Sequence, residues 1–147
     1  MNDSIFLYKT LIRTRWGDMD SMGHINNTQY FRYMEQARVE WLASLGYLVG
    51  STDRQDGQVI ADASCVFRVA LKYPADVEVV VNGEKPGRSS LKMIYQLKMK
   101  DTNQIVADGA STLVWISPET GRSKNLPDRI RQLFSSPGFT HDNVISH

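Results

Sequence analysis

The stretch that decides the fold is NTQYFRYMEQARVEWLASLGY, residues 27–47. Its large apolar residues recur at intervals of three and four, and polar residues fill most of the remaining positions. This spacing is typical of an amphipathic helix that packs one side against a core, and Gly46 is a natural stop. We therefore predict one long helix whose apolar stripe consists of Tyr30, Tyr33, Met34, Ala37, Trp41 and Leu45.

Strand patterns lie on both sides of this helix. Residues 6–16 predict a first strand, with Phe6, Tyr8, Thr10 and Ile12 on one face. After the helix, turn-forming residues separate four further strand patterns, at residues 59–71, 76–85, 89–100 and 104–117. We expect hairpin connections to make these four strands antiparallel. A short helix around residues 126–134 follows, with Pro127 at its start.

The order of strand, long helix and four strands predicts an α+β fold, in which a five-stranded antiparallel sheet wraps the helix. With 147 residues and 41% hydrophobic content, the chain is expected to form one domain over residues 1–147. Its core would span about residues 5–135, and residues 136–147 would form a polar C-terminal tail. Because a sheet edge is usually covered or paired, we also expect strand-to-strand dimerisation.

Composition argues against several classes of protein. The net charge is +1 and the basic residues are spread along the chain, so we expect no nucleic-acid partner. A single cysteine, Cys65, excludes an internal disulfide, and its apolar strand predicts an inert thiol. No apolar run has transmembrane length and the N-terminus lacks a secretory leader. We therefore expect no membrane association and a cytoplasmic location.

Chemistry-bearing residues gather in WGDMDSMGHINNTQY, residues 16–30, directly before the long helix. One explanation is helix capping, with Asn26 or Asn27 as the cap and Asp18 or Asp20 near the positive helix end. The other is catalysis, because free N–H groups at a helix start favour developing negative charge and a nearby carboxylate could attack a carbonyl or activate water. Gly23 would let a substrate carbonyl approach the backbone. The residues alone do not choose between the two aspartates.

The spacing Trp16-Gly17-Asp18-Met19-Asp20-x-x-Gly23-His24-Ile25-Asn26-Asn27-x-x-Tyr30 resembles the signature of the 4-hydroxybenzoyl-CoA thioesterase-like, hotdog-fold proteins. The helix residues 33–38, YMEQAR, are also similar to the family's helix. The resemblance covers roughly residues 5–135 and implies a hotdog fold.

The resemblance implies an acyl-CoA thioesterase. Asp20 would be the catalytic carboxylate, as nucleophile or general base, and the backbone N–H of Asn27 would be the oxyanion donor. The supporting residues of the motif would be Asp18, Gly23, His24, Asn26 and Tyr30, with His24 in a packing or hydrogen-bonding role. Substrates would be thioesters of coenzyme A or of acyl carrier protein, with no other cofactor and no metal. The active sites would lie at the interface of a homodimer or of a tetramer built from two dimers.

Candidate substrate-binding residues are spread over the rest of the chain. Arg68, Lys72 and Arg88 lie in or near turns that could reach the phosphates of coenzyme A, and Ser89 or Ser90 could add hydrogen bonds. Tyr33 could line the acyl site. Each of the first five is more often a solvated surface residue, and core packing alone also accounts for Tyr33. The alternatives to hydrolysis are a hotdog dehydratase, whose His and acid pattern the chain lacks, and a non-catalytic module that binds or senses acyl thioesters.

Overall fold

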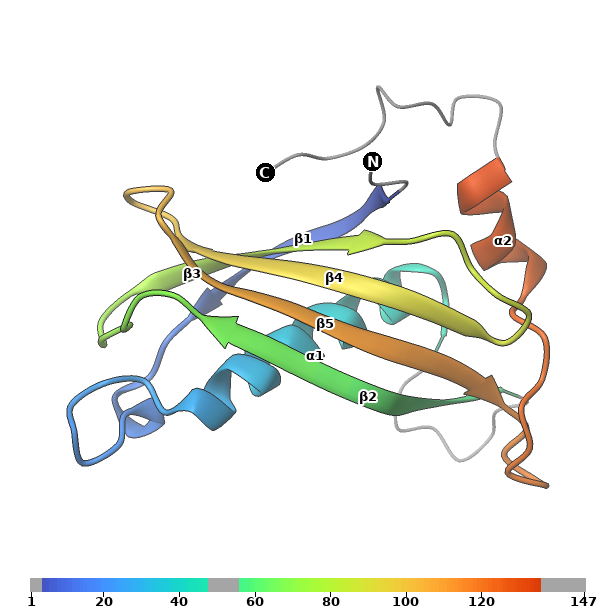
Figure 1. Cartoon of the computed structure of the whole chain (residues 1–147), viewed down its shortest axis with the longest axis horizontal. Helices are drawn as coiled ribbons and strands as arrows, with labels where there is room; N and C mark the ends of the chain where they lie inside the picture. The colour runs from blue at the N-terminus through green and yellow to red at the C-terminus, as the bar shows by residue number, and fades with distance from the viewer. Residues whose placement is uncertain (1–3, 48–55, 136–147) are drawn as a thin grey trace.

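The computed structural model describes residues 4–47 and 56–135. A strand, β1, and the long helix, α1, are followed by four strands and a short helix, α2 (Figure 1). The bounds are β1 (Ile5–Arg13), the 3-10 turn η1 (Trp16–Asp18), α1 (Asn27–Ser44), β2 (Gly57–Phe67), β3 (Asp76–Gly83), β4 (Ser90–Met99), β5 (Ile105–Ile116) and α2 (Asp128–Ser135).

The five strands form one antiparallel sheet in the order β1-β3-β4-β5-β2, so the predicted sheet is confirmed. The predicted hairpin between β2 and β3 is wrong, because β2 pairs with β5 at one edge while β3 lies between β1 and β4. Residues 68–75 link the two strands across the end of the sheet. The backbone of this link is satisfied elsewhere: the Ile25 N–H donates to Leu71 O at 2.7 Å and the Thr14 N–H to Ala75 O at 3.0 Å.

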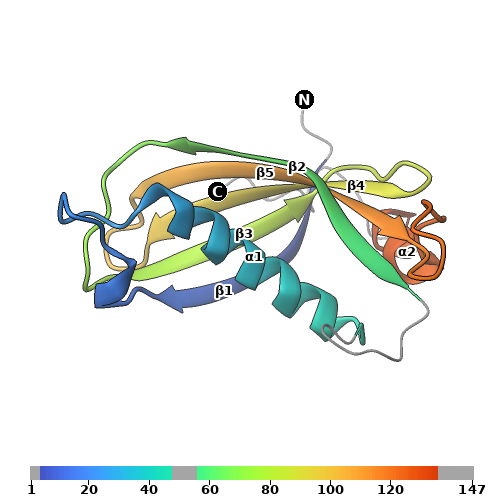
Figure 2. The ribbon, with the colours of Figure 1, turned by 90° about the horizontal axis from the view of Figure 1, so that it is seen from below.

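Helix α1 lies along one face of the sheet, with β1 and β2 on either side of it (Figure 2). The predicted apolar stripe is confirmed: five of its six residues are buried, and Leu45, just past the helix end, is partly buried. Leu42 is buried as well. Gly46 has φ +92°, in the left-handed region that glycine adopts without a steric penalty, and ends the helix.

The register of β1 corrects one detail of the predicted strand. A shift between Phe6 and Tyr8 places Phe6 opposite Asn82 and Tyr8 opposite Val81, so Leu7 is the extra residue of a β-bulge. Both Leu7 and Tyr8 pack against the core, whereas Phe6 is 42% exposed. Phe6 therefore does not share the face of Tyr8 and Ile12, because the bulge interrupts the alternation that the sequence pattern assumes.

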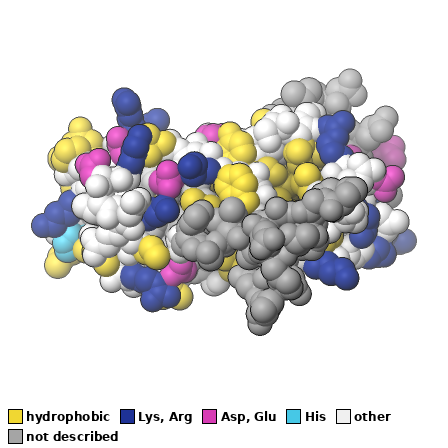
Figure 3. Space-filling view, turned by 90° about the horizontal axis from the view of Figure 1, so that it is seen from above, with side chains coloured by type: hydrophobic (Ala, Val, Ile, Leu, Met, Phe, Trp, Pro, Cys, Tyr) yellow, Lys and Arg dark blue, Asp and Glu magenta, His cyan; other side chains and the backbone are white. Residues whose placement is uncertain are grey.

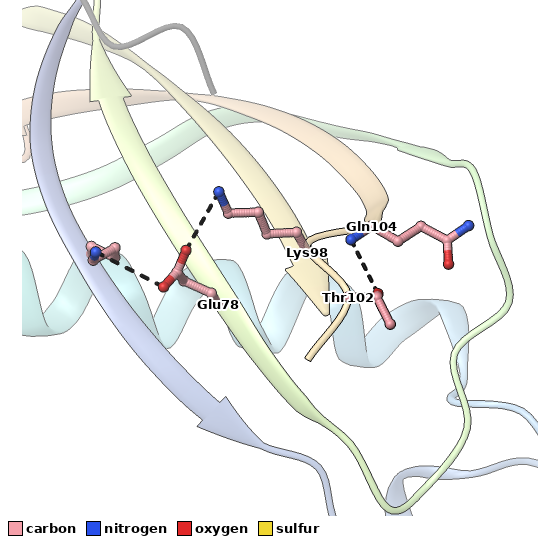
Figure 4. A network of polar contacts seen from close by, with 5 residues as sticks. Glu78, Lys98, Thr102 and Gln104 are labelled. Carbon is pink, nitrogen blue, oxygen red and sulfur yellow. Dashed lines mark hydrogen bonds and ion pairs between the residues drawn. The ribbon is translucent and has the colours of Figure 1, made fainter. Parts of the chain in front are cut away.

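The opposite face of the sheet is more polar. Glu78 on β3 pairs with Lys98 on β4 at 3.5 Å and with Lys9 on β1 at 3.9 Å, and Gln104 donates its backbone N–H to the Thr102 hydroxyl at the β4–β5 turn (Figure 4). The Lys9 side chain is 56% exposed, and an ion pair this open contributes little to stability. On the side of the molecule in Figure 3, positive and negative side chains are interspersed rather than separated by sign.

The remaining predictions concern the chain ends and connections. Helix α2 begins one residue after Pro127, close to the predicted start. No helix in residues 4–47 or 56–135 has the length and apolarity needed to cross a membrane. The predicted C-terminal tail, residues 136–147, lies outside the described residues.

Candidate active site

The residues before α1 fold into a small closed loop. Met19 and Ile25 form a β-bridge, the Asp20 N–H donates to His24 O at 2.9 Å, and the Gly23 N–H donates to Asp20 O at 3.0 Å. Gly23 has φ +78°, which the tight turn requires and which other residues adopt only with strain. The Asp20-to-Gly23 turn is thereby held directly ahead of the helix.

Asn26 is the residue that caps α1. Its side-chain oxygen accepts the Thr28 N–H at 2.9 Å, and its carbonyl oxygen accepts the Gln29 N–H at 2.9 Å. For the Asn27 N–H, which directly precedes these two satisfied donors, no acceptor is recorded in the described parts of the chain. The first residue of the helix therefore presents a free N–H at the positive end of the helix dipole.

The two aspartates of the motif have different surroundings. The Asp18 carboxylate is partly buried and accepts two hydrogen bonds, from the Tyr33 hydroxyl at 2.7 Å and from the Arg15 N–H at 3.0 Å. Burial, followed by this hydrogen bond, raises the pKa of Tyr33 well above its usual value. Asp20 is exposed, and its carboxylate accepts only the Met22 N–H, at 2.9 Å, among the recorded bonds of the described residues. One carboxylate is engaged in holding the loop, and the other is open to solvent.

Asp20 and Asn27 line the same cavity of about 320 Å³, which we call the Asp20 hollow. The loop contributes Asp20, Met22, His24 and Ile25, α1 contributes Asn27 and Tyr30, and the end of β2 with the following link contributes residues 67–70. The second wall is thus formed by residues 67–70, which the sequence pattern placed at the end of a strand over residues 59–71.

Aromatic and apolar groups close the back of the Asp20 hollow. Tyr30 is 2% exposed, and its ring meets that of Phe67 edge-on with centroids 5.0 Å apart. Burial raises the pKa of Tyr30 and, with a smaller contribution from the Asp108 carboxylate, raises the pKa of the Cys65 thiol to about 11. Cys65 is therefore a neutral thiol near neutral pH, in line with the inert role predicted from the sequence.

The structure brings some of the predicted substrate-binding residues to the hollow and leaves others far from it. Arg68 lines the hollow but forms an ion pair with Asp108, and Lys72 is exposed just beyond the lining. Tyr33 is turned toward Asp18, away from Asp20. Arg88 lies at the opposite end of the sheet, beyond β3, where it donates to Ser123 at 2.6 Å and to Asn125 at 3.0 Å. Ser89 and Ser90 are its neighbours at that end.

Sequence reasoning missed two features. The first is the wall formed by residues 67–70, which depends on the long-range crossing of the β2–β3 link. The second is a buried polar group, in which Arg38 donates to the Tyr95 hydroxyl and that hydroxyl lies 2.7 Å from Ser111 Oγ. The available signal was the presence of polar atoms at inward-facing strand positions, since buried polar atoms need partners.

The described residues contain no group of three or more His, Cys, Asp or Glu side chains that could hold a metal ion. What the loop offers is an exposed carboxylate, a free helix N-terminal N–H and a partly apolar cavity that both of them line. These elements suit attack on a carbonyl, because the N–H can stabilise the negative charge that develops on its oxygen.

Comparisons with known proteins agree with this chemistry. A structure described as a "putative Thioesterase from Pseudomonas aeruginosa" is 35% identical, with a TM-score of 0.82 over 87% of this chain and 98% of that one. A "putative acyl-CoA thioesterase from Xanthomonas campestris" is also 35% identical, with a TM-score of 0.70 over 80% of this chain and 99% of that one. A "Putative esterase" of Aquifex aeolicus is 26% identical over 87% of this chain and 96% of its own length.

The family comparison covers the site and nearly the whole fold. The model of the Thioesterase-like superfamily matches residues 14–134, which include the loop, α1, the four strands after it and nearly all of α2. The protein therefore belongs to the Thioesterase-like superfamily.

Proposed function

We propose that the protein is an acyl-CoA thioesterase, which hydrolyses a thioester to a free acid and coenzyme A. The observation that carries this proposal is the pairing of an exposed carboxylate, Asp20, with the free N–H of Asn27 in one hollow. Superfamily membership supports thioester hydrolysis in general. We read the sheet and the α1 helix as a hotdog fold, with α1 as its central helix and one domain over the chain.

In the proposed reaction the thioester carbonyl oxygen accepts a hydrogen bond from the Asn27 N–H. As a general base, Asp20 takes a proton from a water molecule whose oxygen bonds to the carbonyl carbon, and the tetrahedral oxyanion forms against Asn27. The C–S bond then breaks, and the coenzyme A thiolate takes the proton held by Asp20. As a nucleophile, Asp20 would instead form a mixed anhydride with loss of the thiolate, and water would hydrolyse the anhydride.

The other motif residues would support this arrangement. The Met22 N–H orients the Asp20 carboxylate, and the Gly23 turn and the Asn26 cap set the position of Asn27 relative to it. His24 would pack or hydrogen-bond at the wall of the hollow, and Arg68 would be the nearest cation for a coenzyme A phosphate. The reaction as written needs no metal or further cofactor, and a cytoplasmic location stays a prediction.

We also propose that two copies pair along β2. This strand is a sheet edge, and four of its apolar side chains are between 37% and 56% exposed: Val59, Ile60, Val66 and Phe67. An edge of this kind favours pairing with a second strand. Phe67 also lines the Asp20 hollow, so a partner at β2 would border the site. Light scattering of the purified protein tests this, and a monomer at micromolar concentration would contradict it; a tetramer would mean that two such dimers associate.

The test of the activity is thiol release from a panel of acyl-CoAs, short, long and aromatic, by the natural protein and by Asp20→Asn. We expect turnover on at least part of the panel and its near-complete loss in the variant, with the circular dichroism spectrum unchanged. Turnover that survives Asp20→Asn would refute the proposed role of Asp20.

Two further outcomes distinguish the alternatives. If the natural protein binds acyl-CoA but turns none over, acyl carrier protein thioesters are the next substrates, and failure there supports a binding module. A single turnover in oxygen-18-labelled water separates the two roles of Asp20, because label enters the Asp20 carboxylate only by the nucleophilic route. Label in Asp20 would establish the nucleophilic route, and its absence would count against that route.

A further inference from the structure

Another cavity lies on the flank of α1 that faces β1, whereas the Asp20 hollow lies toward β2. It has a volume of about 470 Å³, and β1 is the edge strand of the sheet beside it (Figure 2). The last residues of β1 and those that follow them form one wall, and polar side chains of α1 form the other. We call this cavity the β1 groove. Its volume is in the range of sites that bind small organic molecules.

Three arginines line the end of the β1 groove that is nearest the loop before α1. Arg13 ends β1, Arg15 lies just before η1, and Arg32 lies in the second turn of α1. Arg32 pairs with Glu35 at 3.2 Å. No ion pair of Arg13 or Arg15 is recorded in the part of the chain that the structure describes. Even with Glu35 and the nearby Asp18 counted against them, the three guanidinium groups leave this end with an excess of positive charge.

The two carboxylates that line the groove accept hydrogen bonds from tyrosines. The Tyr33 hydroxyl donates to Asp18 at 2.7 Å, and the Tyr8 hydroxyl donates to Glu40 at 3.3 Å. Glu40 follows Arg32 by eight residues, which is roughly 12 Å along a helix. The groove therefore has a cationic end beside the loop and an acidic end beside Glu40, so a bound molecule would carry its negative charge at one end only.

Amide side chains of α1 line the groove between these two ends. Gln36 donates its side-chain N–H to Glu40 at 2.8 Å, which leaves its carbonyl oxygen as an acceptor that faces the same cavity. Gln29 lies on the same flank, two helical turns earlier. Hydroxyl groups are the natural partners of amide and carboxylate oxygens. The uncharged part of a bound molecule should therefore be rich in hydroxyl groups.

We propose that the β1 groove binds a sugar phosphate, with the phosphate at the three arginines and the sugar hydroxyls toward Gln36 and Glu40. A guanidinium offers a planar fork of N–H donors that matches phosphate oxygens, and such charge-assisted hydrogen bonds are stronger than neutral ones. This site goes beyond the proposed thioesterase function, because it lies on the other flank of α1 and uses neither Asp20 nor Asn27.

The test is titration calorimetry of the natural protein, in a buffer without phosphate, with four probes: ribose 5-phosphate, ribose, inorganic phosphate and ribulose 1,5-bisphosphate. We expect ribose 5-phosphate to bind at least about tenfold more tightly than ribose, the scale of one charge-assisted hydrogen bond, and more tightly than inorganic phosphate. The bisphosphate should bind no more tightly than ribose 5-phosphate, because its second phosphate would meet Glu40. Excess coenzyme A should leave the affinity for ribose 5-phosphate unchanged.

Substitutions assign the binding to the groove. Arg13→Met and Arg15→Met remove exposed charges and should each weaken ribose 5-phosphate about tenfold. Arg122→Met is the matched control, because it removes an exposed arginine beyond β5, at the opposite end of the sheet, and it should leave the affinity unchanged. If Arg13→Met does not fold, Arg13→Lys keeps the charge without the planar fork, and affinity should fall severalfold. Glu40→Gln should improve binding of the bisphosphate.

Each other outcome overturns a stated part of the inference. Equal affinity for ribose and ribose 5-phosphate would mean that the arginines hold no phosphate. Tighter binding of the bisphosphate in the natural protein would show a general attraction to negative charge, as expected of solvated surface arginines. Displacement by coenzyme A would place the sugar phosphate in the thioester site. None of these results bears on thiol release, so the proposed thioesterase function stands or fails separately.

Discussion

The two sides of the loop before α1 use the same residue type for different purposes. On one side, Asp18 is partly buried and accepts hydrogen bonds from Tyr33 on the helix and from the Arg15 backbone. On the other, Asp20 is exposed, accepts one backbone N–H and lines a cavity beside the free N–H of Asn27. Asp18 is thus held by two donors and Asp20 by one, and this difference makes Asp20 the better candidate for a catalytic carboxylate.

One backbone hydrogen bond links Asp18 to the start of α1, beside Asp20. The Asp18 carbonyl oxygen accepts the Asn26 N–H at 2.9 Å, and Asn26 is the cap that precedes Asn27. The Tyr33–Asp18 hydrogen bond therefore fixes the strand of the loop that sets the distance between Asp20 and the helix start. We therefore expect substitutions at Asp18 or Tyr33 to lower the free energy of unfolding more than they lower turnover.

The largest expected effect comes from exchanging each aspartate for asparagine. Asp20→Asn should lower kcat/KM by about 10²–10⁴-fold, the usual contribution of general acid–base catalysis. Its unfolding free energy should change by less than about 0.5 kcal/mol, because the group is exposed and an amide oxygen can still accept the Met22 N–H. Asp18→Asn should show the opposite pattern: a clear loss of unfolding free energy in urea and a smaller loss of kcat/KM. If Asp18→Asn abolishes turnover without loss of stability, the two roles have been assigned the wrong way round.

Tyr33→Phe should have the next largest effect. It removes the 2.7 Å hydrogen bond to Asp18 from a buried position, which should cost about 1–2 kcal/mol of unfolding free energy. We expect turnover to fall by less than about tenfold, because Asp20 and Asn27 remain in place. In urea titrations, Tyr33→Phe combined with Asp18→Asn should cost less than the sum of the two single changes. Full additivity would show that the two side chains do not act as a pair.

The sequence predicts the fold to a large extent, for reasons that particular elements make clear. The stripe from Tyr30 to Leu45 is long and regular, so local periodicity alone identifies α1. Turn residues delimit the strands to within a few positions, except at the end of β2. The pairing of β2 with β5 escaped prediction, because tight-turn residues such as Pro74 mark a reversal of the chain without saying which strand it will join.

The parts of the candidate site that depend on neighbouring residues in the sequence were predictable, and those that depend on contacts between distant residues were not. Capping rules left Asn26 and Asn27 as alternatives, and only the bond from the Thr28 N–H to the Asn26 side chain decides between them. Asp18 and Asp20 have equal cap preferences, so their separate roles depend on Tyr33, a full fifteen positions after Asp18. Arg88 was a reasonable candidate from its turn position, yet β3 carries the chain to the far end of the sheet before it.

Gly23→Ala tests the contrast between Asp18 and Asp20 in another way, because it strains the loop while leaving both aspartate side chains unchanged. At φ +78° an alanine costs about 1–2 kcal/mol, and its Cβ would meet no atom within 4 Å, so the cost is conformational. Gly121→Ala is the matched control, with φ +72° and equally open surroundings in the turn after β5. Urea unfolding should show similar losses for both variants, and only Gly23→Ala should lower thiol release. Equal turnover in the two would mean that the turn geometry does not set Asp20.

The smallest expected effect concerns Cys65, which packs against the core beside Tyr30, a residue that lines the Asp20 hollow. Burial raises the pKa of the Cys65 thiol to about 11, so the folded state favours the neutral thiol. The stability that this contributes is present below the usual thiol pKa of about 8.5–9 and is lost as the pH rises through about 11.

Alkylation by iodoacetamide measures this directly, because Cys65 is the only cysteine in the sequence. The rate in the folded protein should reach half its maximum near pH 11, and in urea it should do so near the usual thiol value. A half-maximum near pH 8.5 in the folded protein would mean that water reaches the thiol. The core beside Tyr30 would then be accessible to water, and Cys65 would not differ in solvation from the exposed Asp20.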